Sequence, residues 1–115
     1  MSHHKRPPPV MRIFIACSPD YHNRRAIMEA VGSIFLDTIE QQRQYYYFDC
    51  PAMNDIFEDG IVNRAIFQLV PNDGDGSASL RTFGFSYIVA GGDEAFVTKI
   101  LSEVGSSDAV VVRLA

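Results

Sequence analysis

The sequence predicts an α+β fold of the ferredoxin-like class, in which a βαββαβ chain forms an antiparallel sheet with two helices on one face. The order of apolar segments supports this class, because strand-like and helix-like patterns alternate as strand, helix, strands, helix and strand. The length also supports it, since 115 residues are enough for one domain with a single two-layer core. The segment 40–79 is longer than this fold requires, so we expect an extended insertion there.

The first strand is predicted at residues 12–17, an apolar run rich in residues that favour strands. A Ser-Pro-Asp sequence ends it, and either Asp20 or Asn23 can cap a helix that begins at Arg24. In that helix, apolar side chains recur at helical spacing, as expected for one buried stripe. The members of the stripe are Ile27, Met28, Val31, Ile34, Phe35, Thr38 and Ile39.

The end of this helix has two interpretations. Gly32 disfavours a helix by up to about 1 kcal/mol, so the helix can end there. In that case residues 34–39 begin the second strand. Otherwise the helix continues along the whole stripe, and the second strand lies further along the chain. The sequence alone leaves both open.

The segment after residue 43 contains two further strand-like runs. Residues 45–48 are three tyrosines and a phenylalanine, a run typical of strands, and Pro51 follows it as a stop. Residues 54–60 are acidic and irregular. Residues 64–70 are predicted as a strand closed by Pro71.

A further strand is predicted at residues 80–90. It follows the connection 72–77, which is rich in Gly and Asp, so it should form a β-hairpin with the strand at 64–70.

The C-terminal part of the chain is predicted as a helix and a final strand. Asp93 can cap the helix, and Gly105 is a natural stop. Its apolar stripe consists of Phe96, Val97, Ile100, Leu101 and Val104. The last strand is expected at residues 109–114.

Residues 81–88 have two chemically different faces if they form a strand. Alternation places Arg81, Phe83, Phe85 and Tyr87 on one face, and small side chains on the other. On a covered face such rings are ordinary core. On an open face, rings beside an arginine form a platform for unpaired bases, with about 1–3 kcal/mol per stacked base.

These residues resemble the octamer of the RNA-recognition motif family, through Arg81, Phe83, Gly84 and Phe85. Thr82, Ser86 and Ile88 depart from the family pattern. The first three residues of 13–18 also match the family's hexamer. The resemblance implies that Phe14, Phe83 and Phe85 stack on RNA bases and that Arg81 contacts the phosphate backbone. Arg12 and Tyr87 complete the predicted RNA-binding set.

A second resemblance is to the sixth protein of the bacterial-type small ribosomal subunit, which is also ferredoxin-like. It depends on short segments after the first strand, at 64–67 and at 108–110. It implies contacts with ribosomal RNA and with a neighbouring protein through the sheet.

Charge and composition limit the class of function. The net charge of −4 argues against a broad electrostatic grip on duplex nucleic acid, but not against stacking of a single strand. The two cysteines are too few for a disulfide framework and indicate reduced, buried thiols in an intracellular protein. Residues 1–10 are expected to be a basic, proline-rich flexible arm without secretory character, and residues 11–115 a single domain. No apolar run is long enough to span a bilayer.

No complete catalytic set, metal site or cofactor motif is found. His22 with Asp20 or Asp49 could in principle perform acid–base chemistry, but a surface histidine beside a helix cap is the favoured interpretation. We therefore expect a non-catalytic module that stacks single-stranded RNA on its open sheet face, with a protein partner in a ribonucleoprotein assembly. The alternative is a ribosomal or other protein-interaction subunit whose sheet face is covered by its partner.

Overall fold

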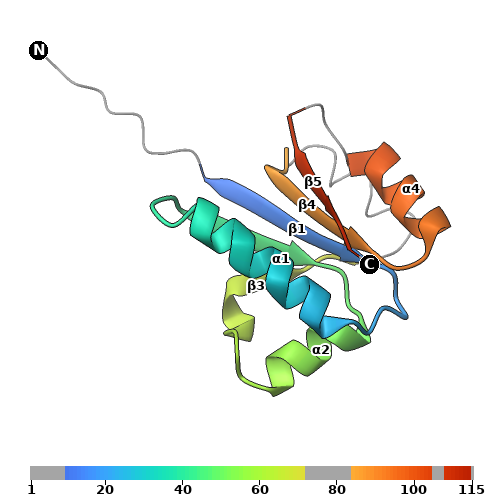
Figure 1. The fold of residues 1–115 in the computed structure, drawn as a ribbon, viewed down its shortest axis with the longest axis horizontal. Coiled ribbons are helices and arrows are strands. Elements are labelled where there is room, and N and C mark those ends of the chain that lie inside the picture. Colours follow the sequence, from blue (N-terminus) through green and yellow to red (C-terminus); the bar gives the residue numbers. More distant parts are fainter. Residues whose placement is uncertain (1–9, 72–83, 105–107, 115) are drawn as a thin grey trace, which may run out of the picture.

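The fold is an α/β sheet structure in which all five strands run parallel. The computed structural model describes residues 10–71, 84–104 and 108–114. The strand order across the sheet is β3-β2-β1-β4-β5 (Figure 1). The elements are β1 (Met11–Cys17), α1 (Arg24–Asp37), β2 (Arg43–Tyr47), α2 (Pro51–Glu58), the short 3-10 helix η1 (Arg64–Ile66), β3 (Phe67–Leu69), β4 (Tyr87–Gly91), α4 (Glu94–Val104) and β5 (Val110–Arg113).

β1 is the central strand, and its side chains supply two separate cores. Ile13 lies in register with Tyr45 of β2 and Tyr87 of β4, so both edges of β1 are paired. Ile13, Ile15 and Cys17 point into one core, whereas Phe14 and Ala16 point into the other. An apolar run with both faces buried is typical of a parallel sheet.

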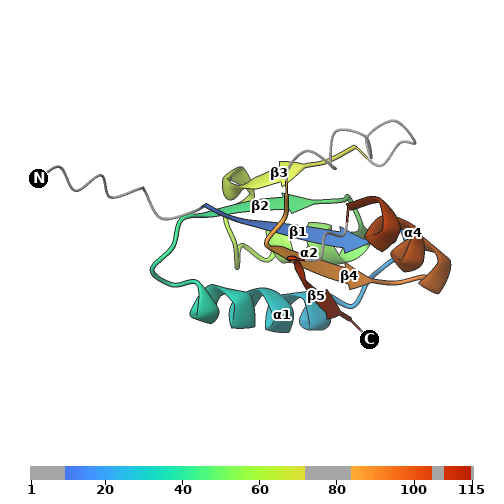
Figure 2. The ribbon, with the colours of Figure 1, turned by 90° about the horizontal axis from the view of Figure 1, so that it is seen from above.

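Helices cover both faces of the sheet. α1 and α2 pack on the first core through residues such as Ile27 and Met53, and α4 packs on the second through Val97 and Ile100. Figure 1 shows α1 crossing in front of the sheet, and Figure 2 shows the same helix to one side of the strands. The result is a three-layer arrangement.

The ferredoxin-like prediction, with an antiparallel sheet and two helices on one face, is therefore wrong. The predicted hairpin between 64–70 and 80–90 is also wrong, because β3 pairs with β2 whereas β4 pairs with β1 and β5. The expected insertion at 40–79 is also wrong for its described part, residues 40–71, since β2, α2 and β3 within it are integral to the sheet layers. Local patterns specify strands, but they do not specify strand direction.

Several predicted elements are confirmed. The strand at the start of the domain, the helix beginning at Arg24 and the helix after Asp93 are present. Asn23 is the cap of α1, since its Oδ1 accepts a hydrogen bond from the amide of Ala26 at 3.2 Å. α1 continues through Gly32, which excludes a strand at 34–39.

The helix α2 was not expected. Pro51, interpreted as the stop of a strand, occupies the first turn of this helix, where its missing N–H and its restricted φ are tolerated. The predicted strand at 64–70 is divided into η1 and the short β3. Of the predicted strand at 80–90, residues 87–90 lie in β4, and residues 80–83 lie outside the described residues.

None of the helices within the described ranges is long and apolar enough to cross a membrane.

Replacing Phe14 tests whether the second core is correctly assigned. The Phe14 side chain is fully buried, and its ring lies 4.9 Å from that of Phe48 and 4.8 Å from that of Phe85. We expect Phe14→Ala to lower the free energy of unfolding in urea by about 3–5 kcal/mol. Leu36→Ala, at a position 70% exposed on α1, is the control and should change it by less than about 1 kcal/mol. Equal effects of the two substitutions would contradict the assignment.

Candidate functional site

The strand order creates a crevice at the carboxyl ends of β1 and β4. From β1 the chain proceeds through β2 to β3 on one side, and β4 then lies on the other side of β1. The connection after β1 leads to α1 on one face, while that after β4 leads to α4 on the opposite face. In open parallel sheets, ligands bind in the crevice that opens where the two connections diverge.

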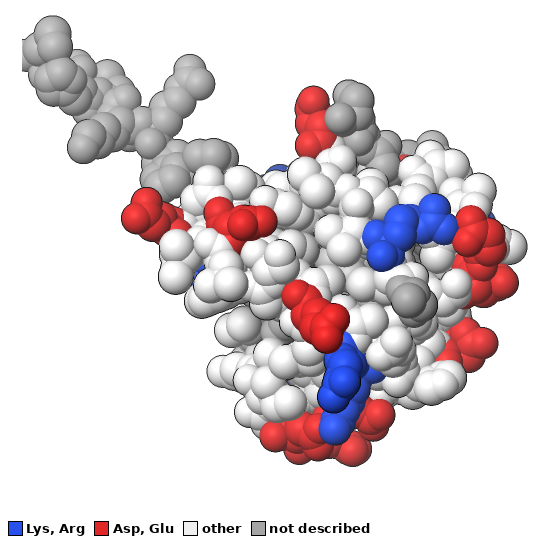
Figure 3. Space-filling view, viewed as in Figure 1, with Lys and Arg blue, Asp and Glu red and all other residues white. Residues whose placement is uncertain are grey.

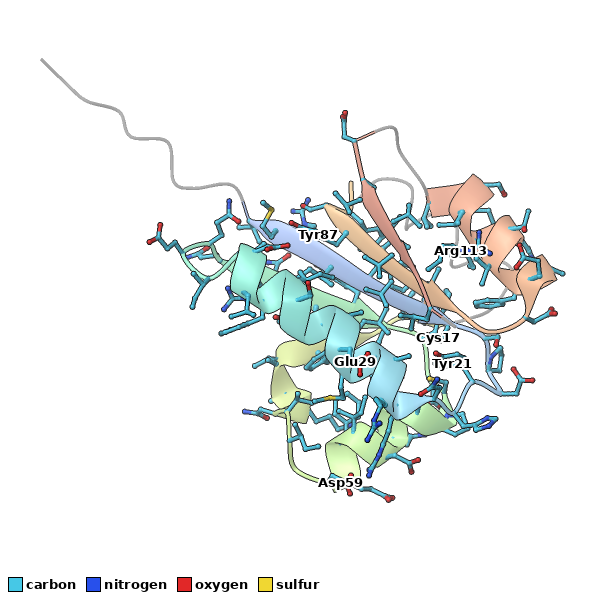
Figure 4. All side chains as sticks on the ribbon, in the orientation of Figure 1. Cys17, Tyr21, Glu29, Asp59, Tyr87 and Arg113 are labelled. Atoms are coloured by element: carbon cyan, nitrogen blue, oxygen red, sulfur yellow. The ribbon has the colours of Figure 1, made fainter. Side chains whose placement is uncertain are left out.

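A pocket of about 440 Å³ lies in this position, and we call it the switch-point crevice. Most of its lining residues carry polar side chains. Its lining residues are Ser18, Asp20, Tyr21, His22 and Asn23 from the β1–α1 loop, and Gly92 and Asp93 from the β4–α4 loop. Figure 4 shows Cys17 and Tyr21 together at this end of the sheet, with Tyr87 toward its opposite end.

Ser18 connects the two loops. Its side chain is 2% exposed, its Oγ donates to Asp20 Oδ1 at 2.9 Å, and the same oxygen accepts from the Asp93 amide at 3.2 Å. The Ser18 amide also donates to the carbonyl of Gly91 at 3.0 Å. The hydroxyl is thus used as donor and as acceptor. This arrangement indicates a structural role for Ser18 and not that of a nucleophile.

Gly92 allows the two loops to approach closely. Its φ of +103° is a conformation that residues with a side chain rarely adopt. A Cβ at this position would also lie 1.8 Å from Ser18 Oγ. Only glycine fits both the backbone conformation and the space.

The crevice has two carboxylates that form no ion pair with any described residue. Neither Asp20 nor Asp93 forms an ion pair within the described part of the chain, and no Lys or Arg is among the lining residues. The nearby arginines are directed elsewhere: Arg24 pairs with Asp59, and Arg113 with Glu94. In Figure 3, red acidic atoms gather at the right-hand edge, where β1 and β4 end. The crevice therefore favours ligands that donate hydrogen bonds over anions.

His22 does not form a catalytic pair with a carboxylate. Its Nδ1 lies 3.1 Å from the backbone oxygen of Asp20, and not against a carboxylate oxygen. Asp49, the other predicted partner, accepts from the side-chain amide of Asn54 at 3.1 Å and does not line the crevice. His22 is exposed beside the capped start of α1, as expected for a surface histidine.

Two buried thiols, Cys17 and Cys50, lie close to Tyr21 of the crevice. The pKa of Cys17 is raised to about 12, chiefly by burial and next by the neighbouring Cys50, against a smaller lowering effect of a backbone hydrogen bond from Gly91. Burial also raises the pKa of Cys50 and that of Tyr21. Both thiols are free and protonated at neutral pH, so they are not activated nucleophiles.

No metal centre is found in the part of the chain that the structure describes. Its His, Cys, Asp and Glu side chains form no group of three or more that could hold a metal ion. Asp20, His22 and Asp93 share the crevice but do not form such a group.

The predicted RNA-binding residues are not brought together on an open face. Phe14 and Phe85 are 0% and 3% exposed in the core beneath α4, so neither ring is accessible to a base. Tyr87 is partly buried on the opposite face. Arg12 lies near the amino end of β1, where its Nε donates to Gln44 Oε1 at 3.4 Å. Arg81 and Phe83 lie outside the described residues.

Sequence reasoning paired His22 with Asp20 but considered Asp93 only as a helix cap, and it did not identify Ser18 or Gly92 as site residues. A signal was present, because Gly91-Gly92-Asp93 and Ser18-Pro19-Asp20 both directly follow apolar strands. In a parallel sheet these two segments meet at one edge. The antiparallel prediction concealed this relationship.

Comparisons of the chain with models of protein families, with curated proteins and with solved structures found no match. We therefore infer function from the geometry and charge of the switch-point crevice.

Gly92→Ala tests the close approach of the two loops. We expect it to lower the free energy of unfolding by about 1–3 kcal/mol more than Gly60→Ala, because the added methyl group meets Ser18. Gly60 is a matched control, since it also has a positive φ, of +67°, but open space around it. Urea unfolding of both variants measures the difference. Equal losses would show that only the backbone conformation, and not the contact with Ser18, requires glycine at residue 92.

Cys17 should make the free energy of unfolding fall as the pH rises into the alkaline range. In the unfolded chain the thiol ionises near 9.0, whereas in the folded chain it stays protonated up to about pH 12. The unfolded state loses this proton first, so the contribution is constant below pH 9 and then falls by up to about 1.4 kcal/mol per pH unit. We expect the wild type to lose stability between about pH 9 and about pH 11 faster than Cys17→Ala. If the free energy of unfolding measured in urea changes with pH equally in the two proteins, the Cys17 thiol is not buried and protonated as described.

Proposed function

We propose that this domain binds a small, unphosphorylated, hydroxyl-bearing molecule of the nucleoside or sugar class in the switch-point crevice. The observation that supports it best is that two carboxylates lie in a crevice at the switch point of the sheet. A crevice at the switch point of a parallel sheet is the usual ligand position in such folds, and this one presents Asp20 and Asp93 without a basic partner among the described residues.

Carboxylates at this position suit hydroxyl groups. An ionised carboxylate only accepts hydrogen bonds, and in dinucleotide-binding folds an acidic side chain at this edge of the sheet accepts from the ribose hydroxyls. Asp20 and Asp93 come from the two loops on either side of the crevice, so they can accept from two parts of one ligand.

A phosphate group fits this crevice poorly. The β1–α1 loop, residues 18–23, contains no glycine and so lacks the backbone cradle of phosphate-binding loops. At the start of α4, Asp93 and Glu94 already place negative charge near the helix N-terminus. These features favour a neutral or cationic ligand.

The proposal concerns binding and assigns no catalytic residue. Ser18 is engaged by Asp20 and by the Asp93 amide, and His22 contacts a backbone carbonyl. Binding of single-stranded RNA, a protein partner and a role in a ribosomal or other ribonucleoprotein assembly remain predictions of the sequence. The burial of Phe14 and Phe85 gives these predictions no support, because neither ring is accessible.

Titration followed by amide NMR tests the proposal. Adenosine, ribose and glucosamine are compared with adenosine monophosphate, and we expect at least one unphosphorylated ligand to shift the Gly92 and Asp93 amide signals saturably. The monophosphate should bind at least about tenfold more weakly than adenosine, because Asp20 and Asp93 repel it. Tighter binding of the monophosphate, or shifts confined to other parts of the chain, would refute the proposal.

Matched variants identify the recognising groups. Asp20→Asn keeps an oxygen that can accept from Ser18, and Asp93→Asn keeps a residue suited to the start of a helix. Each should weaken ligand binding by about tenfold or more, as for loss of a hydrogen bond to a charged group. Asp37→Asn removes an exposed carboxylate at the other end of α1 and should leave binding unchanged.

A further inference from the structure

A second concave site lies further along α1 than the switch-point crevice. It is a pocket of about 400 Å³ between the second half of α1, the start of β2 and the segment around η1, and we call it the α1–η1 pocket. Its volume lies within the range of pockets that bind small organic molecules, about 300–1,000 Å³. It shares no lining residue with the switch-point crevice.

The pocket exposes large apolar side chains that the fold leaves uncovered. Phe35 is 41% exposed, Ile61 56% and Ile66 55%, and all three line this one pocket. Scattered exposed apolar residues are normal in proteins, but a concave cluster of them indicates a binding surface. In Figure 3 the lower left of the view, over η1 and the adjoining part of α1, is predominantly white and uncharged.

Gly32 adds an independent observation. A glycine in the interior of α1 disfavours the helix by about 1 kcal/mol relative to alanine. No neighbouring group in the structure requires it, since a Cβ built at this position would meet nothing within 4 Å. Gly32 lines the pocket, so its missing side chain leaves room for a ligand to approach the helix backbone.

Arg43 supplies one positive charge to the pocket. Its guanidinium carbon lies 4.4 Å from the centre of the Phe35 ring, and its Nη1 donates to the backbone oxygen of Thr38. No carboxylate pairs with it among the residues described in the structure. A guanidinium has five N–H donors, so most of them remain available for an acidic group.

We propose that the α1–η1 pocket binds a small amphipathic organic acid. Its apolar body would cover Phe35, Ile61 and Ile66 above Tyr45, which is 8% exposed and stacked on Phe67 at 4.8 Å. Its carboxylate would bind the guanidinium of Arg43. This site is independent of the proposed function of the switch-point crevice.

Decanoate and the neutral decanol are suitable probes, followed by NMR of the methionine methyl groups. Met28 lines the pocket, whereas Met53, a residue of α2, is 1% exposed in the core and reports on the integrity of the fold. We expect decanoate to shift the Met28 signal saturably and to leave the Met53 signal in place. Decanol should bind at least about tenfold more weakly than decanoate, because it lacks the charge that Arg43 recognises.

Substitutions in α1 separate binding from stability. Gly32→Leu places a side chain in the pocket and also improves helix propensity, so it should abolish decanoate binding without lowering the melting temperature. Ser33→Leu adds the same side chain at a neighbouring exposed position that does not line the pocket, and it should retain binding. Arg43→Gln should reduce decanoate affinity about tenfold and leave that of decanol unchanged.

Four outcomes would overturn the proposal. They are the absence of a Met28 shift with decanoate, equal affinity for decanoate and decanol, equal loss of binding in Gly32→Leu and Ser33→Leu, and a dimer in sedimentation whose formation shifts Met28 without any ligand. The last result would assign the pocket to a second copy of the chain.

Discussion

Complete burial of β1 is the constraint on which the rest of this structure depends. Residues 13–17 are at most 1% exposed, because strands pair along both edges of β1 and helices cover both of its faces. A buried strand must satisfy its backbone groups within the sheet, which holds β2 and β4 in register on either side. Burial on both faces also requires α1 and α4 to lie on opposite sides. Their connections therefore separate at the carboxyl end of β1, where the crevice opens.

Ser18 holds the two loops that border this crevice in a fixed arrangement. A buried hydroxyl is stable only when it is hydrogen-bonded, and here it bonds to one group from each loop, the Asp20 carboxylate and the Asp93 amide. Gly92 makes that contact possible because it has no side chain. The two exposed carboxylates are thus held on either side of the crevice by a buried contact beneath them. Position and charge of the candidate site follow from the same few residues.

The sequence predicted local elements better than their arrangement. The stripe of α1 and the capping residue Asn23 are local signals, and both were recognisable. Strand direction is not local, and the continuous apolar run 13–17 fits a buried strand of either kind. Pro51 was ambiguous because proline both ends strands and begins helices. The rings of Phe14 and Phe85 were ambiguous for a similar reason, since alternation shows which residues share a face but not whether a helix covers it. The crevice could not be predicted once the strands were placed antiparallel.

The two candidate sites lie along α1 and differ in their charge and polarity. At its first turn the helix is capped by Asn23, and the adjoining crevice is polar and acidic. Toward its other end lie Gly32, exposed aromatic and aliphatic groups, and the cation Arg43, all of which line the α1–η1 pocket. The ligand classes that suit these environments are opposite, because a carboxylate is repelled by Asp20 and Asp93 but attracted by Arg43. The switch-point crevice should therefore reject the organic acid proposed for the α1–η1 pocket. Both proposed sites include residues of α1 or of the loop before it, so a ligand bound at either site would raise the apparent stability of the folded chain.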